Sequence, residues 1–316
     1  MPLFVRRRRR LAPLARALVA STTLAALPGA ARAQTFDDAL TVGRGQLRTT
    51  VEYSRDRWHE YWEGSLERAN ENIGSVTTRA VTTTAVYGVA GGLNLLAALP
   101  HVGTQASSGP LSDMEGWQDL TVGAKWRFLR ARLADRATLG LTALGSFGTP
   151  TTEYTPDFLP MSIGLGAKRA SARAGVHVAD RTKFFLDATA GHTWRSTVKL
   201  DRPAYYTDGE LVLSDEVAMP DVRDWAVGLG YQDATWCIPV MLVGQRTLGG
   251  GDIRRQDMPF VSNRMDFTRV GGKVMYTVPK LRQLILSVGA ARTLSGRNVG
   301  KSTTIAGGVT TAFRPF

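Results

Sequence analysis

The sequence predicts an all-β protein that forms a transmembrane antiparallel β-barrel of about twelve strands. Three observations predict this fold: an export signal at the N-terminus, apolar and polar residues that alternate along the rest of the chain, and connections that are alternately long and short. Together they favour a chain that leaves the cytoplasm and crosses a bilayer with strands.

Residues 1–33 have the composition of a secretory signal peptide. Arg6–Arg10 form a basic start, Leu11–Ala30 are mostly small and apolar, and Ala31-Arg32-Ala33 is an A-x-A cleavage pattern. The apolar stretch is interrupted by Arg16 and Pro28 and is too short for a spanning helix. The predicted organisation is therefore a signal peptide at 1–33, a periplasmic N-terminal segment at 34–44 and a barrel at 45–316.

The net positive charge falls once the signal peptide is removed. The chain has 39 Lys and Arg against 27 Asp and Glu, a net charge of +12. Seven of the basic residues lie in 1–33, so the remaining 32 exceed the 27 acidic residues by only about five. No concentrated basic patch remains, which excludes nucleic acid as a partner. The single cysteine, Cys237, has neither a disulfide partner nor a metal-ligand companion.

The alternation is clearest in the stretch GWQDLTVGAKWRF, residues 116–128. Leu120, Val122 and Trp126 fall on one face, and Asp119 and Lys125 on the other. Twelve such segments are predicted as strands: Gly45–Arg55, Ser75–Val89, Leu93–Thr104, Gly116–Phe128, Ala137–Thr149, Ser162–Ala179, Lys183–Thr197, Arg223–Gln232, Trp236–Leu248, Arg264–Val278, Leu281–Ser295 and Lys301–Phe313. A register shift near residues 169–171 predicts a bulge in the sixth.

The connections between these segments are sorted by length. Those after odd-numbered segments are long, apart from a short last one, and cover residues 56–74, 105–115, 150–161, 198–222, 249–263 and 296–300. Those after even-numbered segments are short and cover 90–92, 129–136, 180–182, 233–235 and 279–280. Long loops at one end and short turns at the other are typical of bacterial outer-membrane barrels, whereas a soluble sandwich has no reason to sort its loops.

The C-terminus partly matches the ending that such barrels use for assembly. The chain ends in Phe316, but Arg314 and Pro315 break the alternation. Proline cannot donate to a strand ladder, so we expect the last strand to end before it. The expected location is the outer membrane of a Gram-negative cell, with the lipid bilayer and the outer-membrane assembly machinery as partners.

The polar faces of the predicted strands point into the barrel. The candidate lumen-lining residues are Arg48, Glu52, Asp119, Lys125, Arg127, Asp187, Arg195, Asp224, Arg269 and Lys273. Charges of mixed sign either line a solute path or pair with one another, and the sequence leaves both open.

Little in the chain resembles a catalytic centre. The chain has four histidines. On the predicted strands His177 pairs near Phe185 and His192 near Ala170, which separates the two histidines by roughly 20–25 Å at ~3.4 Å per residue. The glycine-rich run Gly249–Asp252 opens no helix, so it does not predict a phosphate loop. We expect no enzymatic activity, no catalytic residue, no cofactor and no metal.

Several short motifs resemble a known family. They are Val86-Tyr87-Gly88 before Leu93-Asn94-Leu95, Ala98-Leu99-Pro100-His101-Val102, Gly116-Trp117-Gln118-Asp119-Leu120 with Gly123-Ala124-Lys125-Trp126-Arg127-Phe128, Ser162-Ile163-Gly164-Leu165-Gly166, and Ala190-Gly191-His192-Thr193-Trp194-Arg195. They are similar to the outer-membrane proteins of the MetA-pathway of phenol degradation family, from about Gly45 to the C-terminus. The resemblance implies a barrel and passage of small, aromatic or apolar compounds; it implies no catalytic residue.

The function that we expect is therefore an outer-membrane channel or passive transporter for small molecules, with a small-molecule solute as its partner. The alternatives are a plugged structural or adhesive barrel whose loops bind surface partners, a barrel hydrolase, and last a soluble exported β-protein. The sequence does not say which solute passes, or whether the loops or residues 34–44 plug the lumen.

Overall fold

The computed structural model describes residues 35–133, 136–207, 209–254 and 258–315. The predicted signal peptide and Phe316 lie outside these residues. No helix in the described part of the chain is long and apolar enough to cross a membrane.

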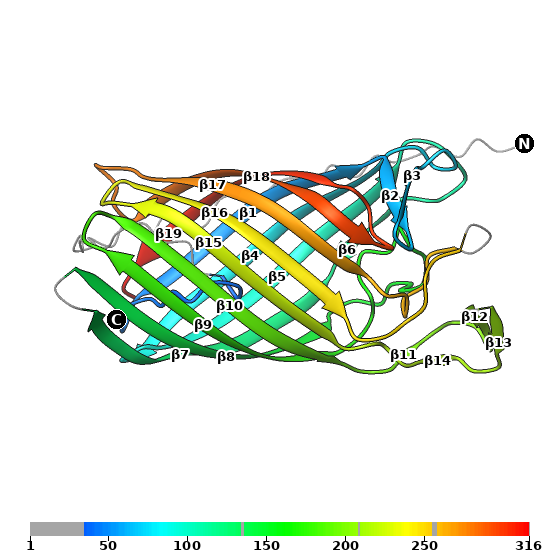
Figure 1. The fold of residues 1–316 in the computed structure, drawn as a ribbon, viewed down its shortest axis with the longest axis horizontal. Helices are drawn as coiled ribbons and strands as arrows, with labels where there is room; N and C mark the ends of the chain where they lie inside the picture. The colour runs from blue at the N-terminus through cyan, green and yellow to red at the C-terminus, as the bar shows by residue number, and fades with distance from the viewer. Residues whose placement is uncertain (1–34, 134–135, 208, 255–257, 316) are drawn as a thin grey trace, which may run out of the picture.

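Twelve strands form the wall of a closed barrel. They are β1 (Leu47–Trp58), β4 (Val76–Ala90), β5 (Leu93–Ala106), β7 (Asp119–Leu133), β8 (Ala137–Pro150), β9 (Arg169–Asp180), β10 (Phe184–Arg195), β15 (Val222–Gln232), β16 (Trp236–Thr247), β17 (Asp266–Thr277), β18 (Leu284–Arg297) and β19 (Thr303–Phe313). Each pairs antiparallel with its neighbours, β1 pairs with β19, and the pairing of β4 with β5 completes the ring (Figure 1). The predicted fold class is confirmed.

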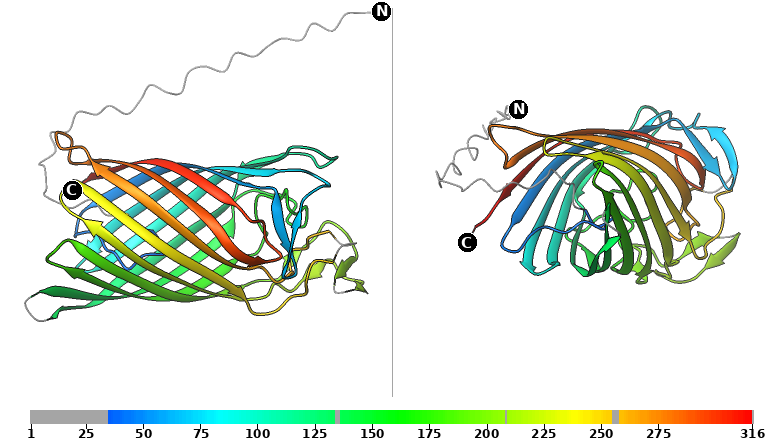
Figure 2. Two further views of the ribbon diagram at one scale, coloured as in Figure 1. Left: turned by 45° about the horizontal axis from the view of Figure 1, so that its top comes forward. Right: turned by 60° about the vertical axis from the view of Figure 1, so that its left-hand side comes forward.

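Seven short strands lie in the connections: β2 (Glu60–Glu63), β3 (Leu66–Ala69), β6 (Met114–Trp117), β11 (Val198–Lys199), β12 (Tyr205–Thr207), β13 (Glu210–Val212) and β14 (Glu216–Val217). All but β6 form separate two-stranded ribbons, and β6 extends the barrel wall beside β5. The ribbons gather at one end of the barrel, and the short turns lie at the other (Figures 1 and 2). We call these the extracellular and the periplasmic end.

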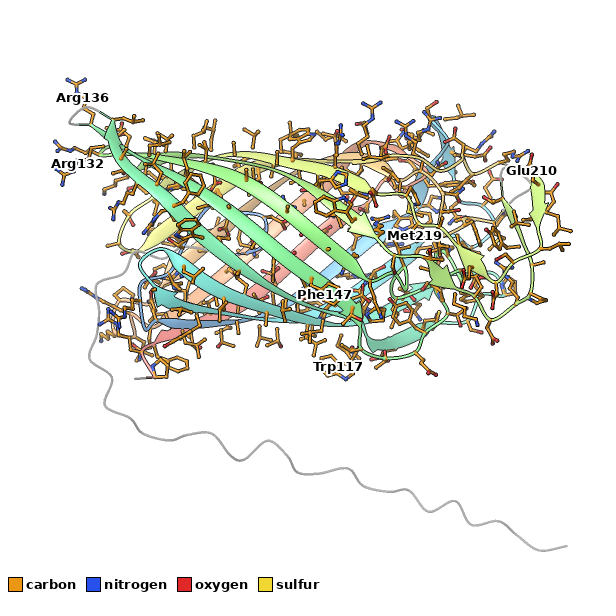
Figure 3. All side chains as sticks on the ribbon, turned by 90° about the horizontal axis from the view of Figure 1, so that it is seen from below. Trp117, Arg132, Arg136, Phe147, Glu210 and Met219 are labelled. Carbon is orange, nitrogen blue, oxygen red and sulfur yellow. The ribbon has the colours of Figure 1, made fainter. Side chains whose placement is uncertain are left out.

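The alternation of residue types decides which side chains face outward. In β7 the side chains of Val122 and Trp126 are exposed on the outer surface, whereas Asp119 and Lys125 are buried. Trp117 and Phe147 also lie on the outside of the wall (Figure 3). Apolar side chains therefore face the position of the lipid, as in other membrane barrels.

The long connections pack against one another at the extracellular end. Buried side chains from three of them form one cluster: Ala167, Val198, Leu200, Val217, Met219, Phe260 and Val261. Residues 151–168 also fold back onto the inner wall, where the hydroxyl of Thr104 on β5 donates a hydrogen bond to the carbonyl of Met161. The loops at this end form a packed layer that leans into the mouth.

The two largest differences between predicted and observed strand boundaries have physical reasons. The predicted sixth strand, Ser162–Ala179, begins only at Arg169, because Ile163 and Ala167 bury their side chains within the loop layer. The fourth was predicted to stop at Phe128, whereas β7 continues to Leu133. A bulge between Arg127 and Leu129 shifts the register there, so the simple alternation stops before the strand does.

The pairing of β9 with β10 is displaced by two residues from the prediction. His177 lies opposite Asp187 rather than Phe185, and His192 lies opposite Ala172 rather than Ala170. The turn is centred one residue later than predicted, at Thr182, and the next residue, Lys183, has a positive φ of 76°. Because the shift is an even number, each side chain keeps its predicted face.

Candidate solute pathway

Residues 35–44, the N-terminal segment, lie inside the barrel. The N–H of Val42 donates to Asn94 Oδ1 at 2.7 Å, and Asn94 Nδ2 donates back to the carbonyl of Val42 at 3.1 Å. The N–H of Ala39 donates to Asp187 Oδ1 at 3.2 Å. Asn94 is on β5 and Asp187 is on β10, so the segment crosses the inner wall between these strands (Figure 2).

Lys125 fixes the start of this segment. Its ammonium donates to the carbonyl oxygens of Thr35 and Asp38 at 2.6 and 2.7 Å and pairs with Asp38 Oδ1 at 2.9 Å. These three bonds use all three donors of the ammonium group. The side chain is 1% exposed, and an amine buried to this degree is tolerated only when it is fully paired.

A second cation holds the middle of the segment. Arg173 on β9 forms ion pairs with Asp224 on β15 and, at 3.4 Å, with Asp37. The hydroxyl of Thr189 on β10 donates to the carbonyl of Asp37 at 2.9 Å. The wall therefore binds both the charges and the backbone of the segment.

Small residues allow the close approach of the segment to the wall. A Cβ atom at Gly88 would lie 2.0 Å from the carbonyl oxygen of Gly43, and one at Gly175 would lie 2.9 Å from Cβ of Ala39. Phe36 and Val42 pack on an apolar part of the inner wall, formed by Val86, Leu96 and Leu144. The sequence placed residues 34–44 in the periplasm; residues 35–44 instead enter the lumen, because partners far along the chain bind them there.

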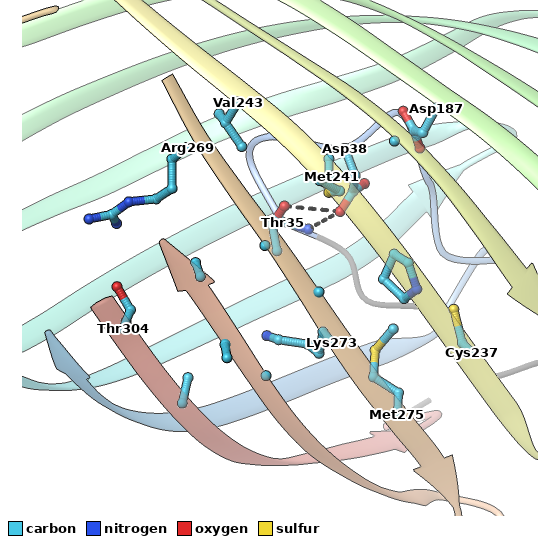
Figure 4. A pocket seen from close by; sticks show the side chains of 18 of the residues that line it. Thr35, Asp38, Asp187, Cys237, Met241, Val243, Arg269, Lys273, Met275 and Thr304 are labelled. Atoms are coloured by element: carbon cyan, nitrogen blue, oxygen red, sulfur yellow. Dashed lines mark hydrogen bonds between the residues drawn. The ribbon is translucent and has the colours of Figure 1, made fainter. Parts of the chain in front are cut away.

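A cavity of about 390 Å³ separates the N-terminal segment from the opposite wall (Figure 4). Thr35, Asp38 and Leu40 form one side of it. The other side is mostly apolar or small and includes Phe185, Cys237, Pro239, Met241, Val243, Gly271, Gly272, Ala291 and Met275. Phe185, Cys237 and Met275 continue into a buried cluster with Ile285.

The charged groups that line this cavity are paired. Lys273 forms an ion pair with Glu52, and Arg269 forms one with Asp56 at 3.1 Å and donates to the hydroxyl of Ser302. Each cation in the wall of the cavity thus has its own carboxylate. The surface left for a solute is chiefly apolar.

Two smaller cavities contain other predicted residues. Arg48 lines one of about 190 Å³, beside Thr82, Thr84 and Thr310. Arg127 lines one of about 110 Å³ together with Leu40 and His177. The imidazole Nδ1 of His177 lies 3.4 Å from Asp187 Oδ2, so His177 borders the same contact that holds Ala39.

Asp119 anchors the loop layer at the extracellular mouth. It pairs with Arg169 at 3.2 Å and accepts a hydrogen bond of 2.7 Å from the hydroxyl of Tyr154. The N–H of Gly166 donates to the same tyrosine oxygen at 3.0 Å. Burial, followed by the hydrogen bond to Asp119, raises the pKa of Tyr154, so the phenol keeps the proton that it donates.

Arg195 also lies at the extracellular end. Its backbone N–H donates to Asp221 Oδ1 at 3.0 Å, which ties β10 to the start of β15. The ten predicted residues thus form three groups: Lys125, Asp187 and Asp224 around the N-terminal segment, Arg48, Glu52, Arg127, Arg269 and Lys273 at the cavities, and Asp119 and Arg195 at the mouth.

Sequence reasoning missed the partners that complete these groups. Arg173 follows the wrongly predicted start of its strand, and Asn94 is a single polar residue in an apolar segment, so the sequence pattern singles out neither. The alternating pattern predicts polar side chains in the lumen, so it does not point to the apolar lining with Phe185 and Met241. Pro239 within a predicted strand was the available signal, since proline interrupts a ladder and marks a special position.

Comparisons with known proteins agree with the barrel. Residues 40–306 match the model of a family described as putative MetA-pathway of phenol degradation. An outer-membrane channel from Pseudomonas putida F1 is similar in structure, with a TM-score of 0.69 and 16% identity over 87% of this chain and 98% of that one. The NanC porin is similar at a TM-score of 0.43 and 9% identity, over 84% of this chain and 98% of that one. No curated protein matches the chain.

Proposed function

This chain belongs to the putative MetA-pathway of phenol degradation family, and we propose that it is a passive outer-membrane channel for small apolar solutes, aromatic compounds among them. The observation that carries the proposal is the apolar cavity between the N-terminal segment and the facing wall. A channel for polar solutes would present unpaired polar groups to its path, whereas here the cations of the cavity wall are matched with carboxylates.

The free energy that a solute gains by burying its apolar surface in the cavity suits passage rather than storage. A monocyclic solute that buries ~150 Å² of apolar surface gains at most about 4 kcal/mol, at roughly 25 cal/mol per Å². That corresponds to dissociation constants of about 1 mM or weaker. Conduction needs binding that is favourable enough for entry and weak enough for release, and this range meets both conditions.

The test compares two neighbouring residues of β16. Met241 lines the cavity, and Leu242 points outward toward lipid. We expect Met241→Trp to lower uptake of a labelled monocyclic aromatic by intact Gram-negative cells at least fivefold, and Leu242→Trp to leave it unchanged. Uptake of a sugar of similar size should be slow with the unaltered protein and with both variants.

Equal uptake by the two variants and the unaltered protein would contradict the proposed path through the cavity. Both variants should show the same heat-modifiable migration on gels, which controls for folding. The measurement is made in cells because their outer leaflet slows the entry of apolar solutes, whereas simple liposomes do not.

The position of the N-terminal segment favours one second candidate, a closed barrel whose loops bind partners at the cell surface. The segment covers part of the inner wall, and the loop layer is packed. The two functions differ in one result: a closed structural barrel transports neither the aromatic nor the sugar, whether or not Met241 is replaced.

A further inference from the structure

Six arginines lie on the outer face of the barrel near its extracellular end. They are Arg55 and Arg57 on β1, Arg79 on β4, Arg223 on β15, Arg246 on β16 and Arg292 on β18. All six are exposed and share the outward phase of apolar neighbours such as Val51, Val227 and Val288. None of them forms an ion pair with a carboxylate of the described residues.

The strand register places these charges side by side. Arg55 lies directly opposite Arg79, and Arg223 lies directly opposite Arg246. Arg57 and Arg292 flank the same residue, Thr303, from its two sides. Like charges directly opposite each other destabilise a sheet, so these pairs call for an anion between them.

The position of the arginines along the membrane normal matches the extracellular edge of the apolar, lipid-facing band of the barrel. Arg79 is eight residues from Tyr87 along β4, and Arg246 is ten residues from Trp236 along β16. With a rise of ~3.4 Å per residue and a tilt of about 40°, eight to ten residues span roughly 20–26 Å of height. The apolar band of such barrels is about 25 Å tall, so the guanidinium groups lie at the level of the outer headgroups.

We propose that the patch formed by Arg55, Arg57, Arg79 and Arg292 binds the phosphate groups of lipopolysaccharide in the outer leaflet. These residues lie on β4, β1 and β18, and β19 separates β1 from β18, so the patch is about 15 Å across at the ~4.8 Å strand spacing. Guanidinium groups bind phosphate oxygens through two parallel charge-assisted hydrogen bonds. A phosphorylated glycolipid also supplies acyl chains for the apolar wall directly below.

Two neighbours orient the patch without neutralising it. Arg57 Nη2 donates to Ser75 Oγ at 3.1 Å, and Arg79 Nη2 donates to Gln105 Oε1 at 3.2 Å. Each contact uses one donor of the guanidinium and leaves the others available. The nearby carboxylate of Glu115 lies 3.8 Å from His101 Nδ1, so its ion-pair partner is the histidine and not an arginine of the patch.

The experiment measures binding of diphosphorylated lipid A to the full-length protein in detergent by native mass spectrometry. The patch variant carries Arg55→Gln, Arg57→Gln, Arg79→Gln and Arg292→Gln. The matched control carries Arg132→Gln and Arg136→Gln, two exposed arginines at the periplasmic end (Figure 3). We expect the patch variant to bind lipid A at least tenfold more weakly and the control to bind it as the unaltered protein does.

Inorganic phosphate and monophosphorylated lipid A separate the headgroup from a free anion. We expect phosphate at equimolar concentration not to displace lipid A, and removal of one lipid phosphate to weaken binding. Undiminished binding by the patch variant, an equal loss in the control, or displacement by equimolar phosphate would each overturn the proposal. Heat-modifiable migration verifies that both variants fold. An Arg→Lys version of the patch keeps the charge but not the paired guanidinium bonds, so its binding of lipid A should fall between that of the unaltered protein and that of the Gln variant.

Discussion

Lys125 shows how one residue can belong to the lumen without contacting a solute. Alternation alone predicts that its side chain points inward, and the structure places it there. The sequence could not indicate what covers it, because Asp38 lies 87 residues away and in a segment without periodicity. A charge that alternation predicts as part of a path is, in the folded protein, an anchor for the N-terminal segment.

We predict that Lys125→Met releases the N-terminal segment. Loss of one partner of a buried ion pair costs about 3–5 kcal/mol, because the other partner is left uncompensated. Ion conductance in planar bilayers should therefore rise, and amide exchange of residues 35–44 should accelerate. Lys183→Met, at an exposed position in a periplasmic turn, is the control and should change neither. Unaltered conductance and exchange in Lys125→Met would show that the segment is held by other contacts.

Gly88 tests the same segment without a change of charge. A Cβ at this position would meet the carbonyl oxygen of Gly43 at 2.0 Å, so Gly88→Ala should displace residues 42–44 at a cost of about 1–3 kcal/mol. Amide exchange at Val42 reports the displacement. Gly91→Ala, whose Cβ would meet nothing within 4 Å, should leave exchange at Val42 as it is. The idea fails if the two variants behave alike.

At the scale of elements, the strands were predictable and the loops were not. Two-residue periodicity depends only on which side meets lipid, so all twelve wall strands could be predicted from sequence. The predicted end of β7 and the predicted start of β9 are wrong. At β7 a bulge interrupts the alternation within a strand, and before β9 a loop with buried side chains resembles a strand in sequence. The loop layer depends on contacts among distant connections, which no local pattern encodes.

The loop that follows β16 is held by one carboxylate. Asp252 pairs with Arg297 and accepts a hydrogen bond of 2.9 Å from Asn298 Nδ2. The hydrogen bond from Arg297 is the main cause that lowers the pKa of Asp252 below its ordinary value of 3.8. The attachment is therefore fully present above pH 3.8 and is lost as the pH falls through the lowered pKa.

We expect proteolysis within residues 249–265 to be slow at pH 7 and to accelerate well below pH 4 with an acid-active protease. Asp252→Asn should be cleaved faster at pH 7, because it cannot form the ion pair. Asp233→Asn, in a periplasmic turn, serves as the control and should leave cleavage of this loop unaltered. A loop whose cleavage shows no dependence on Asp252 would contradict this role.

At the scale of the whole molecule, the outer surface of the barrel is apolar, whereas the surface of a soluble protein is polar. This reversal applies to the outer surface only. Lipid-facing strands are apolar, one half of the lumen binds the N-terminal segment through charges, and the other half is an apolar cavity. The sequence predicted the outer face and the polar half. It did not predict the apolar half, because a lumen wall and a lipid-facing wall look alike in composition.

Depth in the membrane should decide the effect of a charge on the outer face. Val227 lies midway between Tyr231 and Arg223 on β15, and Phe184 lies opposite Tyr231 at the periplasmic edge. We expect Val227→Arg to lower the free energy of unfolding in lipid by about 2–4 kcal/mol and Phe184→Arg by about 0–1 kcal/mol. Urea titration in bilayers measures both. Equal losses would show that β15 is not centred in the membrane as assigned.

The pairing of β1 with β19 has a consequence for the order of folding. Leu47 lies opposite Phe313, so the ring can close only after almost the entire chain has been delivered to the membrane. Contacts so distant in sequence are slow to form. The residues just before β1 must already be inside, or be drawn in, when the last strand arrives. Closure of the seam and enclosure of the chain's own beginning are thus a single late step in the assembly of this protein.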